Sequence, residues 1–140
     1  MLRGTWAGPD TFWLPGGGQN PKETLAACAE REVFEETGVR VTAGPLVALR
    51  EYIQDNHVGG HQMMPGVVHR VDAMFWCSIV KEPAVLGGTE PDTEQTGVEW
   101  VELGKLTSLR TVPSMLARII TDVLAADRTR VTVYLGDTYA

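Results

Sequence analysis

Three glutamates near the end of one predicted helix are the residues best suited to chemistry. Glu32, Glu35 and Glu36 fall on neighbouring positions of one helix face. Like charges at these spacings repel one another, and the C-terminal end of a helix dipole disfavours them further. Arg31 can pair with Glu35 four residues on. The cluster is either a charged helix surface or a site for a divalent cation, because Mg²⁺ binds a few carboxylates together with water and phosphate oxygens.

The segment that positions these glutamates carries signals for both helix ends. Asn20 is predicted as the N-cap and Pro21 as the first helical residue, with Glu23 completing a capping box. Gly38 supplies the left-handed residue with which many helices end. The sequence therefore predicts one helix between Pro21 and Gly38, directly after a run of glycines.

The same stretch resembles the Nudix box over residues 17–39. The spacing G-x5-E-x7-R-E-U-x-E-E-x-G-U, with U an apolar residue, is matched at every defining position by Gly17, Glu23, Arg31, Glu32, Val33, Glu35, Glu36, Gly38 and Val39. The resemblance implies an α/β fold, an α/β/α sandwich on a mixed sheet, with residues 1–140 as a single domain. It also implies a hydrolase that cleaves a diphosphate linked to another group, usually a nucleoside, with Mg²⁺ or Mn²⁺.

The resemblance also implies roles for the charged residues of the box. The metal would be held by carboxylates and one backbone carbonyl: Glu32, Glu36, Glu35 (directly or through water) and Gly16. Arg31 would hold a carboxylate rather than touch the substrate, and Glu23 is either a further ligand or only the capping residue. Asn20 and Lys22 stand where a glutamate and a glycine often occur, so this box has no carboxylate at position 20.

A second acidic segment precedes a predicted strand around Trp100. We expect one of its acids to face the box and to accept a proton from the attacking water, because neighbouring carboxylates raise its pKa. Glu94 is favoured over Glu90 because it lies closer to that strand. A solvent-exposed role for Glu94, with Glu32 as the base, is the alternative.

Contacts to the substrate are expected outside the box. The candidates for stacking on a base are the aromatic residues Trp13, Tyr52, Trp76 and Trp100, and those for binding phosphate are Arg50 and Arg70. Burial in the core is the alternative for each aromatic residue. Residues 55–66 form a loop with His57 and His61, which either covers the pocket, lies plainly on the surface or binds metal.

Periodicity predicts the remaining elements in order. Strands are expected at 40–54 (bent by Gly44 and Pro45), 67–80, 98–103 and 130–135, and helices at 103–109 and 113–126. Apolar residues on both faces of 67–80 predict a central strand. Related proteins usually carry a strand before the box, where this chain has only residues 1–13. Either residues 2–3 are the stub of a strand whose upstream part is missing, or another segment fills its place in the sheet. In the second case we expect residues 130–135, or a partner chain in a homodimer, to occupy that edge of the sheet.

Composition restricts the kind of protein further. A chain of 140 residues with 44% hydrophobic and 21% charged residues is typical of one soluble domain. A net charge of −6 disfavours binding to nucleic acid or anionic membranes, so the partner is expected to be a small molecule. Cys28 and Cys77 are expected as free thiols of a reducing compartment. There is no signal peptide and no apolar run near ~18 residues, which predicts a cytoplasmic protein.

Three functional hypotheses follow from different classes. The first is a hydrolase of a nucleoside diphosphate derivative. The second is a catalytically silent ligand sensor, which would be expected to lack some of the box carboxylates that are present here. The third is an isomerase of an isoprenoid diphosphate, which would need a cysteine facing the substrate, where only Cys28 and Cys77 are available.

Overall fold

The computed structural model describes residues 1–57, 69–125 and 133–137. Its main sheet has the strand order β4-β3-β7 and a second sheet has the order β5-β1-β2-β6. The main sheet consists of β3 (Arg40–Ile53), β4 (His69–Lys81) and β7 (Val133–Asp137), and the second of β1 (Leu2–Gly4), β2 (Thr11–Trp13), β5 (Gln95–Val98) and β6 (Arg110–Thr111). In the main sheet, β4 runs antiparallel and β7 parallel to β3. The predicted mixed sheet is confirmed.

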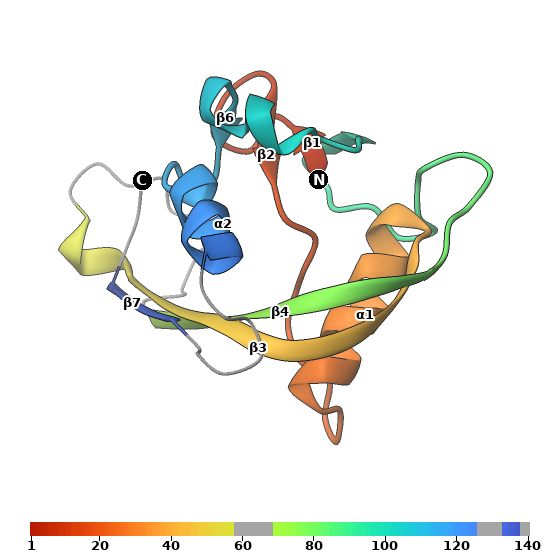
Figure 1. The fold of residues 1–140 in the computed structure, drawn as a ribbon, viewed down its shortest axis with the longest axis horizontal. Coiled ribbons are helices and arrows are strands. Elements are labelled where there is room, and N and C mark those ends of the chain that lie inside the picture. Colours follow the sequence, from red (N-terminus) through yellow and green to blue (C-terminus); the bar gives the residue numbers. More distant parts are fainter. Residues whose placement is uncertain (58–68, 126–132, 138–140) are drawn as a thin grey trace.

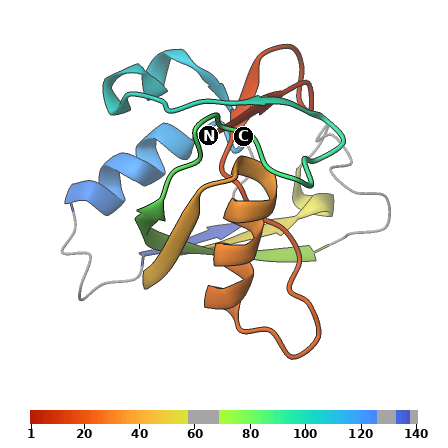
Figure 2. The same cartoon turned by 90° about the vertical axis from the view of Figure 1, so that its right-hand side faces the viewer.

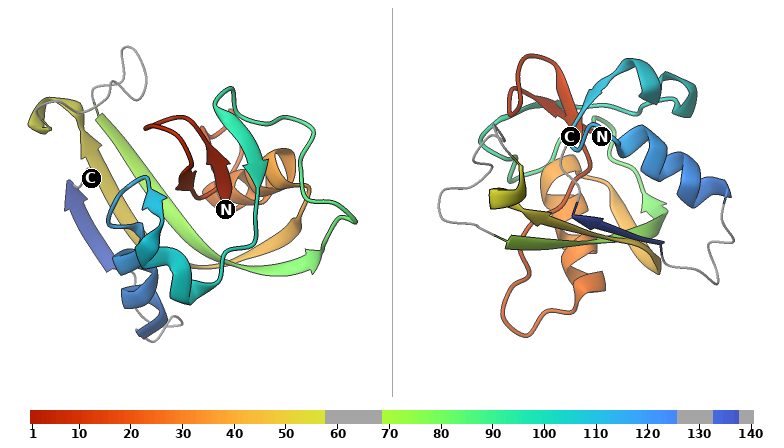
Figure 3. Two further views of the ribbon diagram at one scale, coloured as in Figure 1. Left: turned by 90° about the horizontal axis from the view of Figure 1, so that it is seen from above. Right: turned by 90° about the vertical axis from the view of Figure 1, so that its left-hand side faces the viewer.

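Two helices pack on the main sheet. Helix α1 (Leu25–Thr37) contacts β3 and β4, while α2 (Leu116–Ala125) buries Ile119 and Val123 against Val47 and Ala48 of β3. In Figure 1, α2 and the second sheet lie above the curved β3–β4 ribbon, and the N-terminal end of α1 lies below it. Figure 3 shows the same arrangement from above and from the left. The expected α/β architecture, with helices packed on a mixed sheet, is confirmed.

The long strand β3 is bent where the sequence predicts it. The register with β4 shifts between Ala43 and Leu46, around Gly44 and Pro45. The backbone N–H of Ala43 at this irregularity donates to the carboxylate of Glu30 on α1, at 2.8 Å. The bend therefore brings a backbone donor to the helix that carries the acidic cluster.

The prediction of a central strand at 67–80 was wrong for the part that the structure describes. There, β4 pairs only with β3 and lies at the edge of the sheet. Its apolar residues Val71, Ile79 and Val80 are more than half exposed. One face of β4 packs on the core, and several apolar side chains of the strand stay exposed to solvent. Exposed apolar side chains are common at protein surfaces, so apolar residues on both faces did not require a central strand.

Three other elements also differ from the prediction. Strand β5 ends at Val98 and leaves Trp100 outside with 58% of its surface exposed, because β5 pairs with β1, which is only three residues long. The segment Leu103–Ser108 forms 3-10 turns, and α2 begins at Leu116 rather than at residue 113. The loop prediction for residues 55–66, including His61, lies mostly outside the described residues. Within the described ranges, each helix is too short or too polar to cross a lipid bilayer.

One carboxylate reinforces the pairing of the C-terminal strand with β3. Asp137, the last residue of β7, accepts hydrogen bonds from the backbone N–H of Ile53 at 2.9 Å, from Asn56 Nδ2 at 2.7 Å and from His57 Nε2 at 2.8 Å. The predicted strand at 130–135 is thus found at Val133–Asp137 beside β3, with residues 130–132 outside the described ranges. A homodimer remains a prediction.

Replacing this carboxylate should loosen β7. The hydrogen bonds from Asn56 and His57 lower the pKa of Asp137 to about 2, so its stabilising effect is present above pH 4 and is lost as the pH falls through about 2. We expect Asp137→Asn to lower Tm at neutral pH in a thermal melt. Asp122→Asn, which removes an exposed i,i+4 pair with Arg118, is the control and should leave Tm nearly unchanged. Equal melting of both variants would contradict this role.

Candidate active site

The helix that carries the acidic cluster begins later than the sequence predicts. Its N-cap is Thr24, whose hydroxyl accepts from the N–H of Ala27 at 3.1 Å, so Asn20 was wrongly predicted as the cap and Pro21 lies outside the helix. Asn20 and Glu23 instead close a separate turn: Glu23 N–H donates to the Asn20 carbonyl, and Asn20 N–H donates to Glu23 Oε2. The capping-box pattern is therefore present, but it folds the turn before the helix.

The other end of α1 is fixed by a loop distant in sequence. Gly38 has a φ of 76° and donates to the Phe34 carbonyl, as predicted. Two more backbone carbonyls at this end accept hydrogen bonds from the loop after β4. The Gly88 N–H donates to the Glu36 carbonyl at 3.3 Å, and the Glu90 N–H donates to the Glu35 carbonyl at 2.9 Å. A Cβ on Gly88 would lie 1.8 Å from the Glu35 carbonyl oxygen, so the contact requires glycine. Figure 2 shows this loop passing over the C-terminal end of α1.

A further contact of this loop with α1 comes from a side chain. Gln95 Nε2 donates to the Glu36 carbonyl at 2.9 Å, and Gln95 Oε1 accepts from the N–H of Asp92. The sequence pattern did not reveal this docking, although the adjacent glycines 87 and 88 were a sign of close backbone approach. Its consequence is that the acidic loop sits beside the glutamates of α1.

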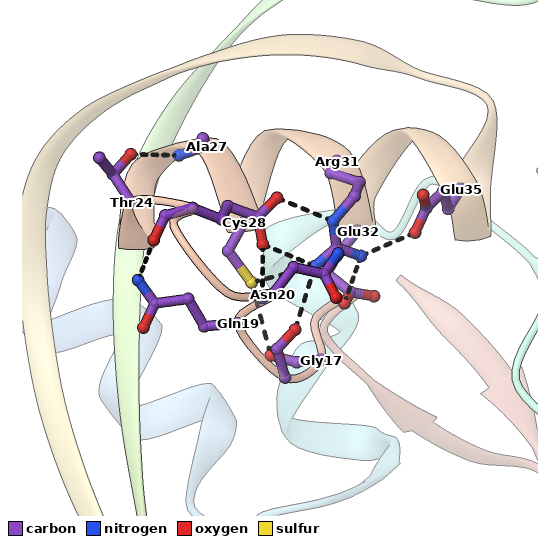
Figure 4. Close-up of polar contacts among 11 residues, drawn as sticks. Gly17, Gln19, Asn20, Thr24, Ala27, Cys28, Arg31, Glu32 and Glu35 are labelled. Carbon is purple, nitrogen blue, oxygen red and sulfur yellow. Dashed lines mark hydrogen bonds and ion pairs between the residues drawn. The ribbon is translucent and has the colours of Figure 1, made fainter.

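Arg31 binds three carboxylates of the box, those of Glu23, Glu32 and Glu35 (Figure 4). Its Nη1 donates to Glu32 Oε1 at 2.7 Å and to Glu35 Oε2 at 2.8 Å. Its Nε and Nη2 donate to the two oxygens of Glu23, and Nη2 also to the Gly18 carbonyl at 3.0 Å. These bonds lower the pKa of Glu23 to about 2. Both oxygens of Glu23 are thus engaged in holding the turn to the helix.

Glu36 is the buried member of the cluster. Only 2% of its surface is exposed, and its Oε2 accepts from the N–H of Gly16 at 2.9 Å. Burial raises the pKa of this carboxyl to about 8, with the nearby Asp92 and Glu32 carboxylates adding to the rise. The glycine run also touches Glu32, since a Cβ on Gly17 would lie 2.4 Å from Glu32 Oε1. The run from Gly16 therefore lines the acidic face of α1.

The donor chemistry fits a hard divalent cation. Glu36 is a buried carboxylate that makes no ion pair with any described cationic side chain, and such a charge is costly unless it is paired. Glu32 and Glu35 each present a second oxygen that Arg31 does not bind. In the described ranges, however, no three Asp, Glu, His or Cys side chains form a ready-made metal cage. Arg31 draws Glu32 and Glu35 toward itself, so a cation would have to compete with it for them.

Glu94, the expected base, is turned elsewhere. Its Oε2 accepts from the hydroxyl of Thr5 at 2.7 Å, and its backbone carbonyl accepts from Thr5 N–H. Asp92, two residues earlier, is the loop acid whose charge acts on Glu36. The prediction named Glu94 for the position facing the cluster, but Glu94 is bonded to Thr5, and Asp92 is the acid of this loop that interacts with Glu36.

The expected substrate contacts divide between core and surface. Trp13 is only 5% exposed and packs edge-on against Trp6, so it has no free face for a base, and its predicted role is not supported. Arg50 is 2% exposed and bonded to Asp72 at 2.8 Å, which makes it a core residue rather than a phosphate ligand. Arg70 shares Asp72 but is partly exposed. Of the other aromatic candidates, Tyr52 is buried, Trp76 packs on the core and Trp100 is exposed.

Arg31→Lys tests the role of the hydrogen bonds from Arg31 to the carboxylates. Lysine keeps the charge but cannot bond Glu23, Glu32 and Glu35 from one planar group. We expect turnover of a diphosphate substrate to fall by about 10–100-fold, as for other residues that orient ligands. Arg40→Lys is the matched control, because Arg40 only stacks on Phe34 at 4.1 Å. Turnover of both variants is measured by phosphate release. Unchanged turnover in Arg31→Lys would show that the contacts of Arg31 with the three carboxylates are not needed for activity.

Comparisons with known proteins agree with this arrangement. A family model described as NUDIX domain matches residues 2–123. The chain is 45% identical over 47 residues to human diphosphoinositol polyphosphate phosphohydrolase 3-alpha, and 47% identical over 47 residues to the bovine 3-beta protein. It is 41% identical over 49 residues to mouse diphosphoinositol polyphosphate phosphohydrolase 2. These segments cover 34%, 34% and 35% of the chain and 29%, 29% and 27% of the respective relatives, so the match spans less than a third of each relative's length.

Proposed function

The chain belongs to the NUDIX domain family, and from that premise we propose that it is a metal-dependent pyrophosphohydrolase. Its substrate would be a nucleoside diphosphate linked to a further group. The observation that carries this proposal is the set of Glu32, Glu35 and Glu36 on the last turns of α1, with Arg31 among them and the glycine run against them. The names of the relatives, which are phosphohydrolases of a diphosphate, support the class of reaction.

The ligands for the metal would be the box carboxylates. Glu32, Glu35 and Glu36 would hold Mg²⁺ or Mn²⁺, with the Gly16 carbonyl as a further ligand. Such an ion neutralises phosphate charge and lowers the pKa of a bound water when it is present. Glu23 would be left to Arg31, since both of its oxygens are engaged there.

The chain's own groups would orient the reaction. Arg31 fixes Glu32 and Glu35, and the N–H of Gly16 fixes Glu36. In the hydrolysis, the oxygen of water forms a bond to phosphorus, the bridging P–O bond breaks, and one proton passes from water to a carboxylate. The loop docked on α1 supplies a carboxylate beside the cluster that is not itself a member of the box.

Two other functions have less support. A silent sensor remains the alternative, but all the box carboxylates are in place. An isomerase would need a cysteine open to the substrate, whereas Cys28 is buried with its thiol directed to the Gly17 carbonyl. We also propose that the chain acts as one domain in the cytoplasm on a small molecule rather than on nucleic acid or a membrane, which its charge of −6 supports.

A panel of diphosphates tests the proposal. Sugar nucleotides, dinucleoside diphosphates, nucleoside triphosphates and inositol pyrophosphates would be incubated with the protein and Mg²⁺ or Mn²⁺. We expect metal-dependent release of two phosphate-containing products, or of a nucleotide and diphosphate, from at least one of them. Binding of a nucleotide, seen as a shift in Tm, without any cleavage would favour the sensor.

A further inference from the structure

One side chain outside the box joins the loop after β4 to the end of α1. Gln95 is the first residue of β5 and is partly buried. Its Nε2 donates to the Glu36 carbonyl at 2.9 Å, and its Oε1 accepts from the N–H of Asp92 at 3.2 Å. The backbone N–H of Gln95 donates to the Asp92 carbonyl at 2.9 Å. Gln95 therefore closes a turn that begins at Asp92 and fastens this turn to the helix.

Both partners of this side-chain amide are backbone groups of fixed polarity. A carbonyl only accepts and an N–H only donates, so the amide of Gln95 fits between Glu36 and Asp92 in one orientation. The last carbonyls of a helix have no partner within the helix, and that of Glu36 is one of them. At this position a glutamate would lack the donor, a lysine would lack the acceptor and a methionine would lack both. Among side chains of this length, both contacts therefore require an amide.

The turn that Gln95 closes carries the loop acid that interacts with the box. The Asp92 carboxylate hydrogen-bonds the carboxyl of Glu36. Glu36 thus meets this turn twice, with its backbone carbonyl through Gln95 and with its carboxyl through Asp92. Asp92 itself is exposed, so its position depends on the hydrogen bonds of its turn rather than on packing in the core.

The backbone contacts of the loop with α1 come from the other side of this turn. Gly88 and Glu90, which precede the turn, donate to carbonyls of the helix. Glu94 follows Asp92 by two residues and is bonded to Thr5, in the segment after β1, rather than to α1. The amide that ends the turn therefore ties its downstream side to the helix.

We propose that Gln95 is a positioning residue, whose amide holds the Asp92 carboxylate beside Glu36 in the place where it can accept a proton from the attacking water. The proposal rests on the proposed function and adds to it a residue outside the box on which turnover depends. Gln95 acts through Asp92, because both contacts of its side chain are to backbone groups. Its loss should lower kcat more than it changes KM, since a misplacement of about 1 Å can cost about 10²-fold in rate.

Gln95→Met tests this role, because it removes both side-chain hydrogen bonds and keeps the length of the side chain. With the diphosphate of the panel that is cleaved fastest, we expect kcat to fall by about 10–100-fold and KM to change little. Thr96→Val is the matched control, because Thr96 is the next residue of β5 and its hydroxyl donates to the Arg3 carbonyl rather than to α1. Its kcat should stay close to that of the unaltered protein. Thermal melts check that both variants are folded.

A double-mutant cycle with Asp92→Asn separates positioning from a merely structural role. If Gln95 acts through Asp92, Gln95→Met should lower kcat by less than about threefold once Asp92→Asn is present, because residues that act as a unit are not additive. Losses that multiply in the double variant would overturn the proposal. So would a kcat of Gln95→Met equal to that of Thr96→Val.

Amide hydrogen exchange tests the hold on the turn without any turnover. We expect residues 89–94 to exchange about tenfold faster in Gln95→Met than in the unaltered protein, as for the loss of two hydrogen bonds, and at unchanged rates in Thr96→Val. If no diphosphate is cleaved but exchange changes in this way, the hydrolase fails and the hold on Asp92 stands. If diphosphates are cleaved but exchange is the same in all three proteins, the positioning proposal is overturned and the hydrolase stands. Absence of both cleavage and faster exchange overturns both.

Discussion

Glu36→Gln is expected to lower turnover of a diphosphate substrate by about 10²–10⁴-fold, because a metal site supplies several kcal/mol of charge stabilisation and each 1.4 kcal/mol changes the rate tenfold. The amide keeps the size of the side chain and can still accept from Gly16 N–H. What it loses is the negative charge of the one fully buried carboxylate of the cluster. The loss should therefore appear in metal-dependent turnover and not as a failure to fold.

Glu30→Gln is the matched control for this variant. Glu30 lies on the same helix, but its carboxylate accepts from the N–H of Ala43, and an amide oxygen can accept in its place. We expect its turnover to stay close to that of the unaltered protein. If Glu36→Gln retained turnover like Glu30→Gln, Glu36 would have no part in the metal site.

The same substitution should change stability in a pH-dependent way. Without metal, burial raises the pKa of Glu36 from 4.5 to about 8. The folded state then binds this proton more tightly than the unfolded state, so stability from this group is present below pH 4.5 and is lost as the pH rises through about 8. Glu36→Gln has no carboxyl to ionise at this position and so does not lose stability as the pH rises. Without metal, we expect its Tm to exceed that of the unaltered protein at pH 8, and the difference in Tm to become smaller toward pH 5.

Metal should reverse this order. A ligand that binds only the folded state stabilises it by about 2.7 kcal/mol at a hundredfold excess over Kd. Mg²⁺ should therefore raise Tm of the unaltered protein at pH 8 and raise that of Glu36→Gln far less. Equal metal-induced shifts in the two proteins would remove Glu36 from the site.

Local features of the site could be predicted from the sequence because they depend on near neighbours. The left-handed Gly38 and the pairing of Arg31 with Glu35 follow from helix geometry within one or two turns. The error at the helix start has a local cause too: Asn20, Pro21 and Glu23 form a turn whose bonds resemble a cap, and Thr24 is the real one. A pattern of types and spacings does not distinguish the two.

Features that depend on distant segments could not be predicted. Docking of the loop on α1 joins Gly88 and Gln95 to Glu36 across more than fifty residues, and nothing in the spacing specifies that partner. The same holds for Arg50, whose burial against Asp72 depends on the register of β3 with β4. Trp13 is buried in the core. An aromatic residue can be buried or can bind a base, and its type alone does not distinguish the two. Sheet register and burial arise from the whole fold, and the sequence pattern constrains them only weakly.

The loop docking also bears on the base that accepts the proton from water. Gly88 and Gln95 fasten the loop on either side of Asp92, and the Asp92 N–H is held by Gln95 Oε1 at 3.2 Å. The carboxylate of Asp92 is close enough to Glu36 to raise its pKa, whereas Glu94 is bonded to Thr5. This carboxylate hydrogen-bonds the carboxyl of Glu36 without belonging to the box, and it would be able to accept a proton once Glu36 binds a metal.

Asp92→Asn is therefore expected to lower kcat by about 10²–10⁴-fold with KM little changed, the range observed for loss of a general base. Glu94→Gln should cost far less, because its bond to Thr5 can be kept by an amide oxygen. The measurements are kcat and KM at saturating Mg²⁺ for both variants, with thermal melts to check that each is folded. A severe loss in Glu94→Gln with a mild one in Asp92→Asn would return the role to Glu94. If both are mild and Glu32→Gln is severe, the base is on α1 itself.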